Sequence, residues 1–161
     1  MVKSIPENYH TVTPSLTFKD SQKAIAFYTK AFNAKALKVY PMPGGHGVAH
    51  ATIQIGNSIL MMADEMPGTE EMSCGKSAET LGSSPISLFV YVPDVDAVFN
   101  QAIAAGCAAT MPLADMFWGD RVGGLKDPFG YAWMIATHTQ DLTDEQIGKG
   151  AEACFASMAK K

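Results

Sequence analysis

The chain of 161 residues repeats one pattern of structural signals at a constant spacing of 74 residues. Four pairs of identical residues coincide at this spacing without a gap: Asp20 with Asp94, Ala31 with Ala105, Ala34 with Ala108, and Gly56 with Gly130. Both aspartates stand where a helix can begin, and both glycines stand in a predicted hairpin. Identity between the halves is otherwise low, so chance matching is the competing explanation. Because these residues and the element types coincide together, we interpret the pattern as a duplicated unit.

Each half predicts the same order of elements: a strand, a helix and three further strands. In the first half, residues 11–18 alternate polar and apolar side chains, as in a half-buried strand. A helix is predicted from Asp20 or Ser21 to Phe32, because its apolar residues recur at helical spacing. The three further strands are predicted at 36–41, 48–55 and 58–65.

The second half repeats this order. A strand is predicted at 86–92, a helix between Asp94 and Gly106, a strand at 108–113, and a final hairpin within 117–138 that turns at 127–130. Residues 65–85 are polar and rich in Gly, Ser and Pro, which indicates a connection between the halves. After the second half, Thr143 and Gln146 form a capping-box pattern at the start of an amphipathic helix.

The predicted fold class is therefore α+β, with two tandem βαβββ units whose curved mixed sheets form a cleft, plus a C-terminal helix. The first unit spans 1–64, the linker 65–85, the second unit 86–138 and the C-terminal helical tail 139–161. A chain of this length is expected to form one domain.

Charge and composition exclude several classes of partner. The net charge is -4, the pI is about 5.5, and no Lys/Arg cluster is present, which argues against nucleic-acid binding. No apolar run approaches the ~20 residues of a membrane span, and the N-terminus has no apolar signal-peptide core. Cys74, Cys107 and Cys154 lie far apart without a C-x-x-C pattern. We expect free thiols and a cytoplasmic protein.

Several short motifs accompany the duplicated order: AIAFYTKAF at 24–32, HATIQIGNSILMMADE at 50–65, FWGDR at 117–121, KDPFG at 126–130 and ATH at 136–138. The duplicated βαβββ order resembles the vicinal-oxygen-chelate superfamily of glyoxalase I, bleomycin-resistance proteins and extradiol dioxygenases. The motifs resemble its PhnB-like branch. The resemblance implies that the two units face each other across a ligand cleft and that a homodimer completes it.

The resemblance also implies positions for a divalent metal ion. In metal-using members, a histidine-type position lies seven residues before the helix-capping acid, and a carboxylate-type position lies four residues after the hairpin glycine. These positions hold Thr13, Ser87, Leu60 and Met134. Zinc, nickel and iron take imidazole, carboxylate or thiolate ligands, so we expect no metal and no other cofactor. A displaced metal site is the alternative, built from His10, His50, Asp64, Glu65 and His138.

Strand alternation from the metal positions predicts a cleft lined by apolar and aromatic side chains, a few hydroxyls, one amide and one imidazole. The residues predicted to bind a ligand are Thr13, Thr17, His50, Gln54, Leu60, Met62, Ser87, Phe89, Tyr91, Phe117, Trp118, Arg121 and Met134. The alternative is that these residues simply fill the interior.

Three of these residues carry alternatives of their own. Phe117 and Trp118 can stack on a ligand, or they can cover the core or a dimer contact. Arg121 can hold an anionic ligand group, or it can form a structural bridge to Asp127 or Asp115, which we favour.

The sequence predicts a small-molecule-binding protein of glyoxalase or bleomycin-resistance type without the superfamily metal. The acidic net charge suits an aromatic or cationic ligand. The alternative is a glyoxalase-like lyase, isomerase or oxygenase that uses a displaced metal or acid–base chemistry at His50 or His138. Whether the protein is an enzyme stays open at this point. A third interpretation is a structural dimer with a filled cleft.

Overall fold

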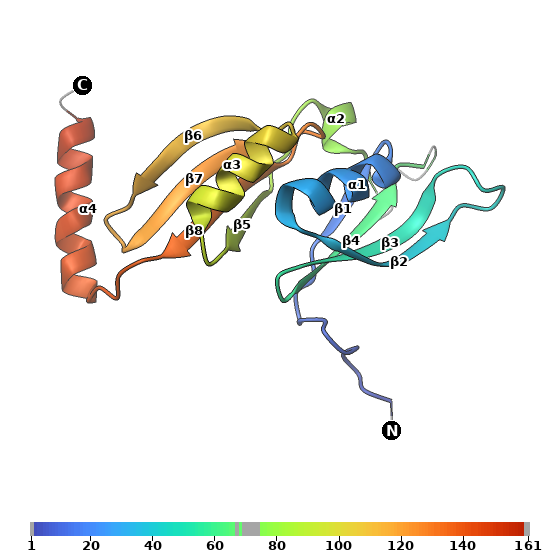
Figure 1. Cartoon of the computed structure of the whole chain (residues 1–161), viewed down its shortest axis with the longest axis horizontal. Coiled ribbons are helices and arrows are strands. Elements are labelled where there is room, and N and C mark those ends of the chain that lie inside the picture. Colours follow the sequence, from blue (N-terminus) through green and yellow to red (C-terminus); the bar gives the residue numbers. More distant parts are fainter. Residues whose placement is uncertain (1, 67, 69–74, 160–161) are drawn as a thin grey trace.

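Two four-stranded sheets lie side by side, and one helix covers the same side of each (Figure 1). The computed structural model describes residues 2–66, 68 and 75–159. The first unit contains β1 (Ser15–Phe18), α1 (Ser21–Phe32), β2 (Lys35–Pro41), β3 (Val48–Ile55) and β4 (Ser58–Asp64). The second contains β5 (Ser87–Tyr91), α3 (Val95–Ala105), β6 (Ala108–Asp115), β7 (Asp120–Lys126) and β8 (Ala132–His138). The short helix α2 (Ala78–Leu81) connects them, and α4 (Asp144–Met158) ends the chain.

Each unit forms its own mixed sheet. The strand orders are β1-β4-β3-β2 in sheet A and β5-β8-β7-β6 in sheet B. The first strand of each unit pairs parallel with the last, and the remaining pairs are antiparallel. The prediction of two tandem βαβββ units with a C-terminal helix is confirmed. Strand β1 begins at Ser15, four residues later than predicted, after Pro14, which cannot donate to a ladder.

The repeated aspartates begin the two long helices, as predicted. The Asp20 side chain accepts from the Lys23 backbone N–H, and the Asp94 side chain accepts from the Ala97 backbone N–H, both at 3.0 Å. Helix α3 ends at Gly106, whose φ is +123°, a conformation that favours glycine. Identical capping chemistry therefore sets the same strand-to-helix entry in both units.

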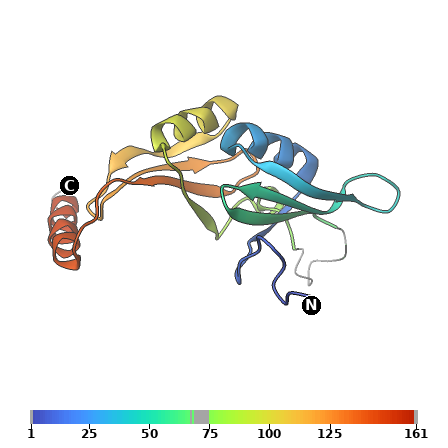
Figure 2. The ribbon, with the colours of Figure 1, turned by 60° about the horizontal axis from the view of Figure 1, so that its bottom comes forward.

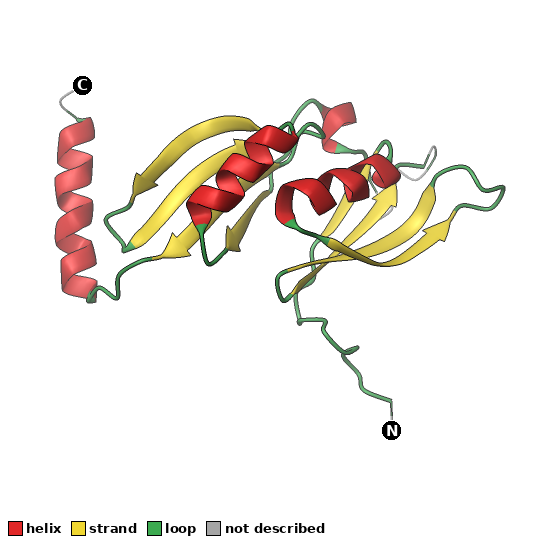
Figure 3. Ribbon diagram, viewed as in Figure 1, coloured by secondary structure: helices red, strands yellow, loops and turns green. Residues whose placement is uncertain are grey.

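The core lies between the helices and the faces of the sheets that they cover, and Figure 3 shows these two layers. Aromatic side chains join the two units within the core. Phe32 of α1 packs against Trp133 of β8, with ring centroids 4.5 Å apart. Asp127 accepts from Tyr28 Oη at 2.6 Å and from Trp133 Nε1 at 2.8 Å. Burial raises the pKa of Asp127 even though these donors and two backbone N–H groups oppose the rise. The units are thus held together by one buried polar centre in an aromatic layer.

The repeat is not free of gaps in three dimensions. The β3–β4 turn contains two residues between Ile55 and Ser58, whereas the β7–β8 turn contains five between Lys126 and Ala132. The register of the parallel ladders differs as well: Ser15 pairs with Met61 in sheet A, whereas Phe89, its equivalent at the 74-residue spacing, pairs with Met134 in sheet B. The first strands keep the 74-residue spacing, but the last strands differ by 73, so Met61, and not Leu60, is the equivalent of Met134.

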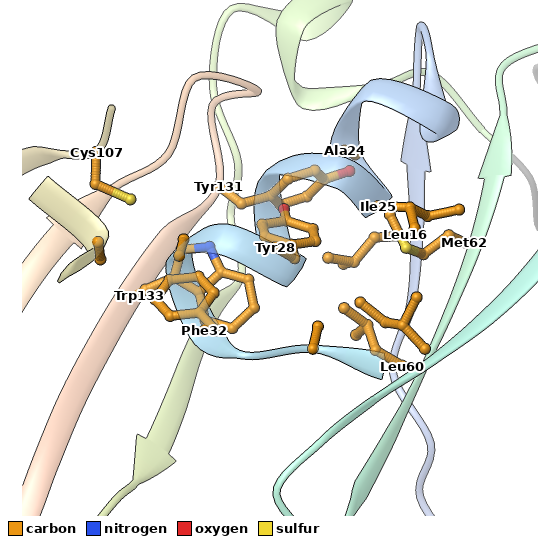
Figure 4. Packing of buried hydrophobic residues seen from close by; sticks show 14 of the residues in the cluster. Leu16, Ala24, Ile25, Tyr28, Phe32, Leu60, Met62, Cys107, Tyr131 and Trp133 are labelled. Atoms are coloured by element: carbon orange, nitrogen blue, oxygen red, sulfur yellow. The ribbon is translucent and has the colours of Figure 1, made fainter. Parts of the chain in front are cut away.

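This one-residue difference corrects the predicted faces of β4. Leu60 and Met62 do not share the face of Thr17; both are buried with Leu16 beneath α1, as Figure 4 shows. Because successive strand residues alternate in direction, the open face of β4 carries Met61 instead.

Over the described residues, sheets A and B do not close on each other; their helix-covered sides point the same way, and both opposite faces stay open (Figure 2). We refer to the sides away from α1 and α3 as the open faces. The packing of α1 beside α3 explains this arrangement, since Gln101 Nε2 donates to the Lys30 carbonyl at 2.7 Å.

Candidate functional site

A cavity of about 730 Å³ lies at the junction of the two units. Its walls come from residues before β1, from the β3–β4 hairpin and from β5, with Phe32 and Trp133 also among the lining residues. Five residues predicted to bind a ligand line it: Thr13, Gln54, Leu60, Phe89 and Tyr91. The cavity is within the volume range of small-molecule sites, and its composition is mainly apolar with a few polar groups.

Beside this cavity, the open face of β5 presents an aromatic pair. Phe89 and Tyr91 are 47% and 61% exposed, and their ring centroids lie 5.2 Å apart at an interplanar angle of 44°. Ser87 shares their face by strand alternation, and Met134 is the neighbour of Phe89 across the ladder. These residues form a continuous surface on which a flat apolar ligand could stack.

The open face of sheet A carries a polar group of side chains. His50 Nε2 lies 3.3 Å from Thr52 Oγ1, and Tyr9 Oη, from the segment before β1, lies 3.4 Å from the same hydroxyl. Tyr40 stacks on His50 with centroids 6.3 Å apart. Tyr9 was not among the predicted site residues, because no sequence pattern around it indicates that the N-terminal segment crosses this sheet. Thr17 lies nearby, and its backbone N–H and carbonyl both bond to Tyr131 Oη.

The most connected polar centre of the open faces is Asp120, at the start of β7. It is 3% exposed and accepts from Tyr91 Oη at 2.8 Å and from Trp118 Nε1 at 3.0 Å. His138 Nδ1 lies 2.7 Å from the other carboxylate oxygen. Burial opposes ionisation of Asp120, but these three hydrogen bonds outweigh it and lower its pKa. Asp120 thus links three predicted ligand or catalytic candidates, Tyr91, Trp118 and His138.

His138 is held between two carboxylates. Its Nδ1 faces Asp120, and its Nε2 lies 3.1 Å from Asp141 Oδ1. The hydrogen bond to Asp120, followed by that to Asp141, raises the pKa of His138. A protonated imidazole is therefore favoured here, with both nitrogens donating. The pairing of Asp120 with His138 across β7 and β8 could have been foreseen only by fixing the register of that hairpin.

Two residues predicted to bind a ligand, Arg121 and Phe117, instead contact other residues of the chain. Arg121 donates to both oxygens of Asp96, at 2.7 and 2.8 Å, and to Asp115 at 3.3 Å. The bridge to Asp115 is confirmed, whereas Asp127 is engaged in the core. Phe117 makes an edge contact with Trp118, centroids 4.9 Å apart, and lies against Gly150 of α4. Arg121 and Phe117 are thus committed to contacts within the chain.

Comparison with known proteins identifies the family. A family model described as the Glyoxalase/Bleomycin resistance protein/Dioxygenase superfamily matches residues 9–135. The chain belongs to this superfamily. No helix of the described residues is both long and apolar enough to cross a membrane.

The superfamily relatives are similar over most of the chain. An uncharacterized protein of Mycobacterium tuberculosis is 36% identical over 138 residues, which cover 84% of this chain and 79% of the relative. The crystal structure of TioX from Micromonospora sp. ML1 has 27% identity and a TM-score of 0.64, covering 80% of this chain and 98% of TioX. A PhnB protein from Bacillus cereus, 22% identical with a TM-score of 0.60, shares the fold.

The residues at the positions inferred for a divalent metal ion do not have the side chains that such an ion binds. Thr13 donates its hydroxyl to the His10 carbonyl, and Ser87, Met134 and Met61 supply no imidazole or carboxylate. Among the residues that the structure describes, no group of three or more His, Cys, Asp and Glu side chains could hold a metal ion.

The displaced set is not assembled either. Asp64 accepts from the backbone N–H groups of Ser21 and Val48, at 2.6 and 2.9 Å, and Glu65 accepts from Ser77 and Thr80. Both carboxylates therefore fix the local backbone.

The cysteines differ in accessibility. Cys107 is a buried free thiol, and burial raises its pKa to about 12, so a reactive thiolate is disfavoured. Cys154, on α4, is also free and partly exposed. Cys74 lies outside the described residues. Cys107 therefore supplies no activated nucleophile.

Proposed function

We propose that the protein binds a small molecule with a planar aromatic or cationic group, and that Phe89 and Tyr91 are its principal contacts. The observation that carries this proposal is the junction cavity of about 730 Å³, which this exposed aromatic pair lines together with Thr13 and Gln54. An aromatic pair left exposed beside a cavity is a costly surface unless a ligand or partner covers it.

Electrostatics supports the preference for a neutral or cationic ligand. The Tyr91 hydroxyl donates to the ionised, buried Asp120, so electron-rich rings line the site while a carboxylate lies behind one of them. Cations are attracted to the faces of such rings. Arg121, the guanidinium expected to hold an anionic group, is already paired with two carboxylates.

We further propose that a homodimer covers the open faces in the cytoplasm. Each sheet packs one face beneath its own helix and has no helix on the other, which is an arrangement that a second copy can complete. The free thiols of Cys107 and Cys154 are consistent with a reducing compartment. A ligand at Phe89 would then be enclosed by both copies.

Proton transfer is the second candidate function, because Asp120 fixes the orientation of His138 at 2.7 Å. A histidine oriented by a buried carboxylate can act as a general acid or base once its other nitrogen is free. The fully exposed Asp141 would have to move away from Nε2 for this. A glyoxalase-like isomerase or lyase reaction would use His138 in that way.

A binding screen tests the proposal. Planar aromatic cations, neutral aromatics and aromatic carboxylates are screened by thermal shift and measured by calorimetry. For a ligand found this way, Phe89→Ala and Tyr91→Ala should each raise Kd about tenfold, the effect of losing about 1.4 kcal/mol of stacking. Leu81→Ala, which removes an exposed side chain on α2, is the matched control. Unchanged affinity in both aromatic variants would refute the proposed site.

Two further measurements separate the candidates. Stoichiometric nickel, zinc or iron in the purified protein would contradict the metal-free reading. For the proton-transfer candidate, His138→Gln should abolish turnover of any substrate found and leave its binding intact. Equal turnover in that variant would remove His138 from consideration.

A further inference from the structure

The C-terminal helix α4 lies outside the part of the chain that the family model covers. The family model ends at residue 135, and the match that covers 98% of TioX accounts for 80% of this chain. Helix α4 begins at Asp144, in a capping box with Thr143. In Figure 1 it stands at the outer end of sheet B, separate from α1 and α3. It is therefore an addition to the duplicated fold.

Little of the chain's own surface supports α4. None of its 15 residues is buried, and Phe155 and Met158 are 64% and 63% exposed. At its middle, an added Cβ on Gly150 would lie 2.8 Å from Phe117 Cβ, so the helix touches the β6–β7 connection closely. A helix of this length is marginal in water by itself, and the glycines at 148 and 150 weaken it further. We therefore expect α4 to be stabilised by packing against a further surface.

The side chains of α4 indicate the chemistry of the surface that would bind it. Its apolar residues recur at helical spacing and form one stripe, which we call the α4 stripe: Ile147, Ala151, Cys154, Phe155 and Met158. Alongside the stripe, α4 carries three acidic residues and one lysine, and Glu145 already pairs with that lysine, Lys149, at 2.6 Å. A complementary partner is apolar at its centre and basic at its rim.

Strand β2 has this chemistry. It is the outer edge of sheet A, and all seven of its residues are exposed. Its exposed apolar side chains are Leu37, Val39 and Tyr40, and its charges are Lys35 and Lys38 without an acidic residue. Neither lysine has an ion-pair partner among the described residues. Proteins commonly protect an exposed sheet edge by covering it with a helix.

The two surfaces cannot meet within one chain, because α4 and β2 stand at opposite ends of the molecule (Figure 1). We propose that the α4 stripe docks on β2 of a second copy of this chain, with the acidic residues of α4 beside the partner's basic edge. In a two-fold dimer the contact occurs twice, since each copy supplies one helix and receives one. The inference concerns assembly and does not rest on the proposed ligand site.

Sedimentation velocity of the full chain across a concentration series tests the docking. Phe155→Asp should weaken self-association at least tenfold, because it places a charge in the apolar centre of the contact. Ile103→Asp, which changes an exposed apolar residue of α3, is the matched control and should leave association unchanged. Circular dichroism establishes that both variants are folded. A monomeric wild type, or equal weakening by both variants, would overturn the proposal.

A charge exchange and a cross-link identify the docking surface. Lys38→Glu should weaken association, and Glu152→Lys combined with it should restore at least part of the loss. Val39→Cys should form an intermolecular disulfide with Cys154 under mild oxidation, whereas Ile103→Cys should not. Association that depends on Phe155 but is indifferent to Lys38, and that yields no 39–154 cross-link, would show that α4 docks elsewhere and would refute the assignment to β2.

Discussion

Replacing Asp127 by alanine should strongly destabilise the protein, because its carboxylate is the acceptor shared by both units. The substitution leaves Tyr28 Oη and Trp133 Nε1, both fully or almost fully buried, without their partner. It also removes the acceptor for the backbone N–H groups of Phe129 and Tyr131. Each buried donor left unpaired costs about 1–3 kcal/mol, so the two side chains alone amount to about 2–6 kcal/mol.

Urea unfolding followed by tryptophan fluorescence measures the loss. With the backbone contribution partly offset by water in the turn, we expect about 3–5 kcal/mol, or a fall in Tm of about 6–20 °C for a chain of this size. The fully exposed Asp141 provides the control, since Asp141→Ala should change stability by no more than about 0.5 kcal/mol.

A double-mutant cycle with Tyr28→Phe isolates the cause. In the wild type, Tyr28→Phe loses a hydrogen bond and should cost about 1–2 kcal/mol. In the Asp127→Ala background it removes an unpaired buried hydroxyl, so it should cost nothing or stabilise the protein. Additive free energies, or a loss below about 1 kcal/mol for Asp127→Ala, would refute the view that Asp127 is a shared acceptor.

Three further predictions follow from the site and its supports. The pKa of His138 is raised in the folded state, so the stability that this residue contributes is fully present below its unfolded pKa and is lost as pH rises through the folded pKa. Asp120→Asn should lower the pKa of His138 measured by NMR titration. An unchanged pKa would contradict the pairing of Asp120 with His138. Gly119 has φ +94°, and a Cβ added to it would collide with the backbone oxygen of Gln140. Gly119→Ala should therefore lower the free energy of unfolding, measured with a chemical denaturant, by more than about 1 kcal/mol. A nearly unchanged free energy of unfolding would contradict this prediction. Met62→Ala should lower the free energy of unfolding by about 2–5 kcal/mol, and Met61→Ala by less than about 1 kcal/mol, because Met62 is in the core and Met61 is on the opposite face of β4. A larger loss for Met61→Ala than for Met62→Ala would contradict this assignment of the faces.

Local signals predicted the elements well. Asp20 and Asp94 begin helices because their side chains bond to backbone three residues onward, and Thr143 with Gln146 forms its capping box for the same reason. Strand alternation identified Phe89, Tyr91 and Met134 as neighbours on one face, as the β5–β8 register shows. These features depend on residues a few positions apart, so the sequence contains them directly.

The faces of β4 were predicted wrongly because the register of a strand is set by its pairing with distant strands. A shift of one residue exchanges the two faces of a strand, so an apparent match of Gly56 with Gly130 was enough to bring Leu60 and Met62 to the wrong side. The parallel pairing of β1 with β4 and of β5 with β8 shows the shift of one residue, and no local pattern in the sequence indicates it.

The sequence by itself determined a duplicated βαβββ chain with a capped C-terminal helix and no suitable donors at the inferred metal positions. Tertiary structure alone decided that the sheets lie side by side, that Tyr91, Trp118 and His138 converge on Asp120, and that Arg121 pairs with Asp96. The physical reason is the range of the interactions. Caps and alternation act within a few residues, whereas a polar centre requires strands distant in sequence to pack in one particular register.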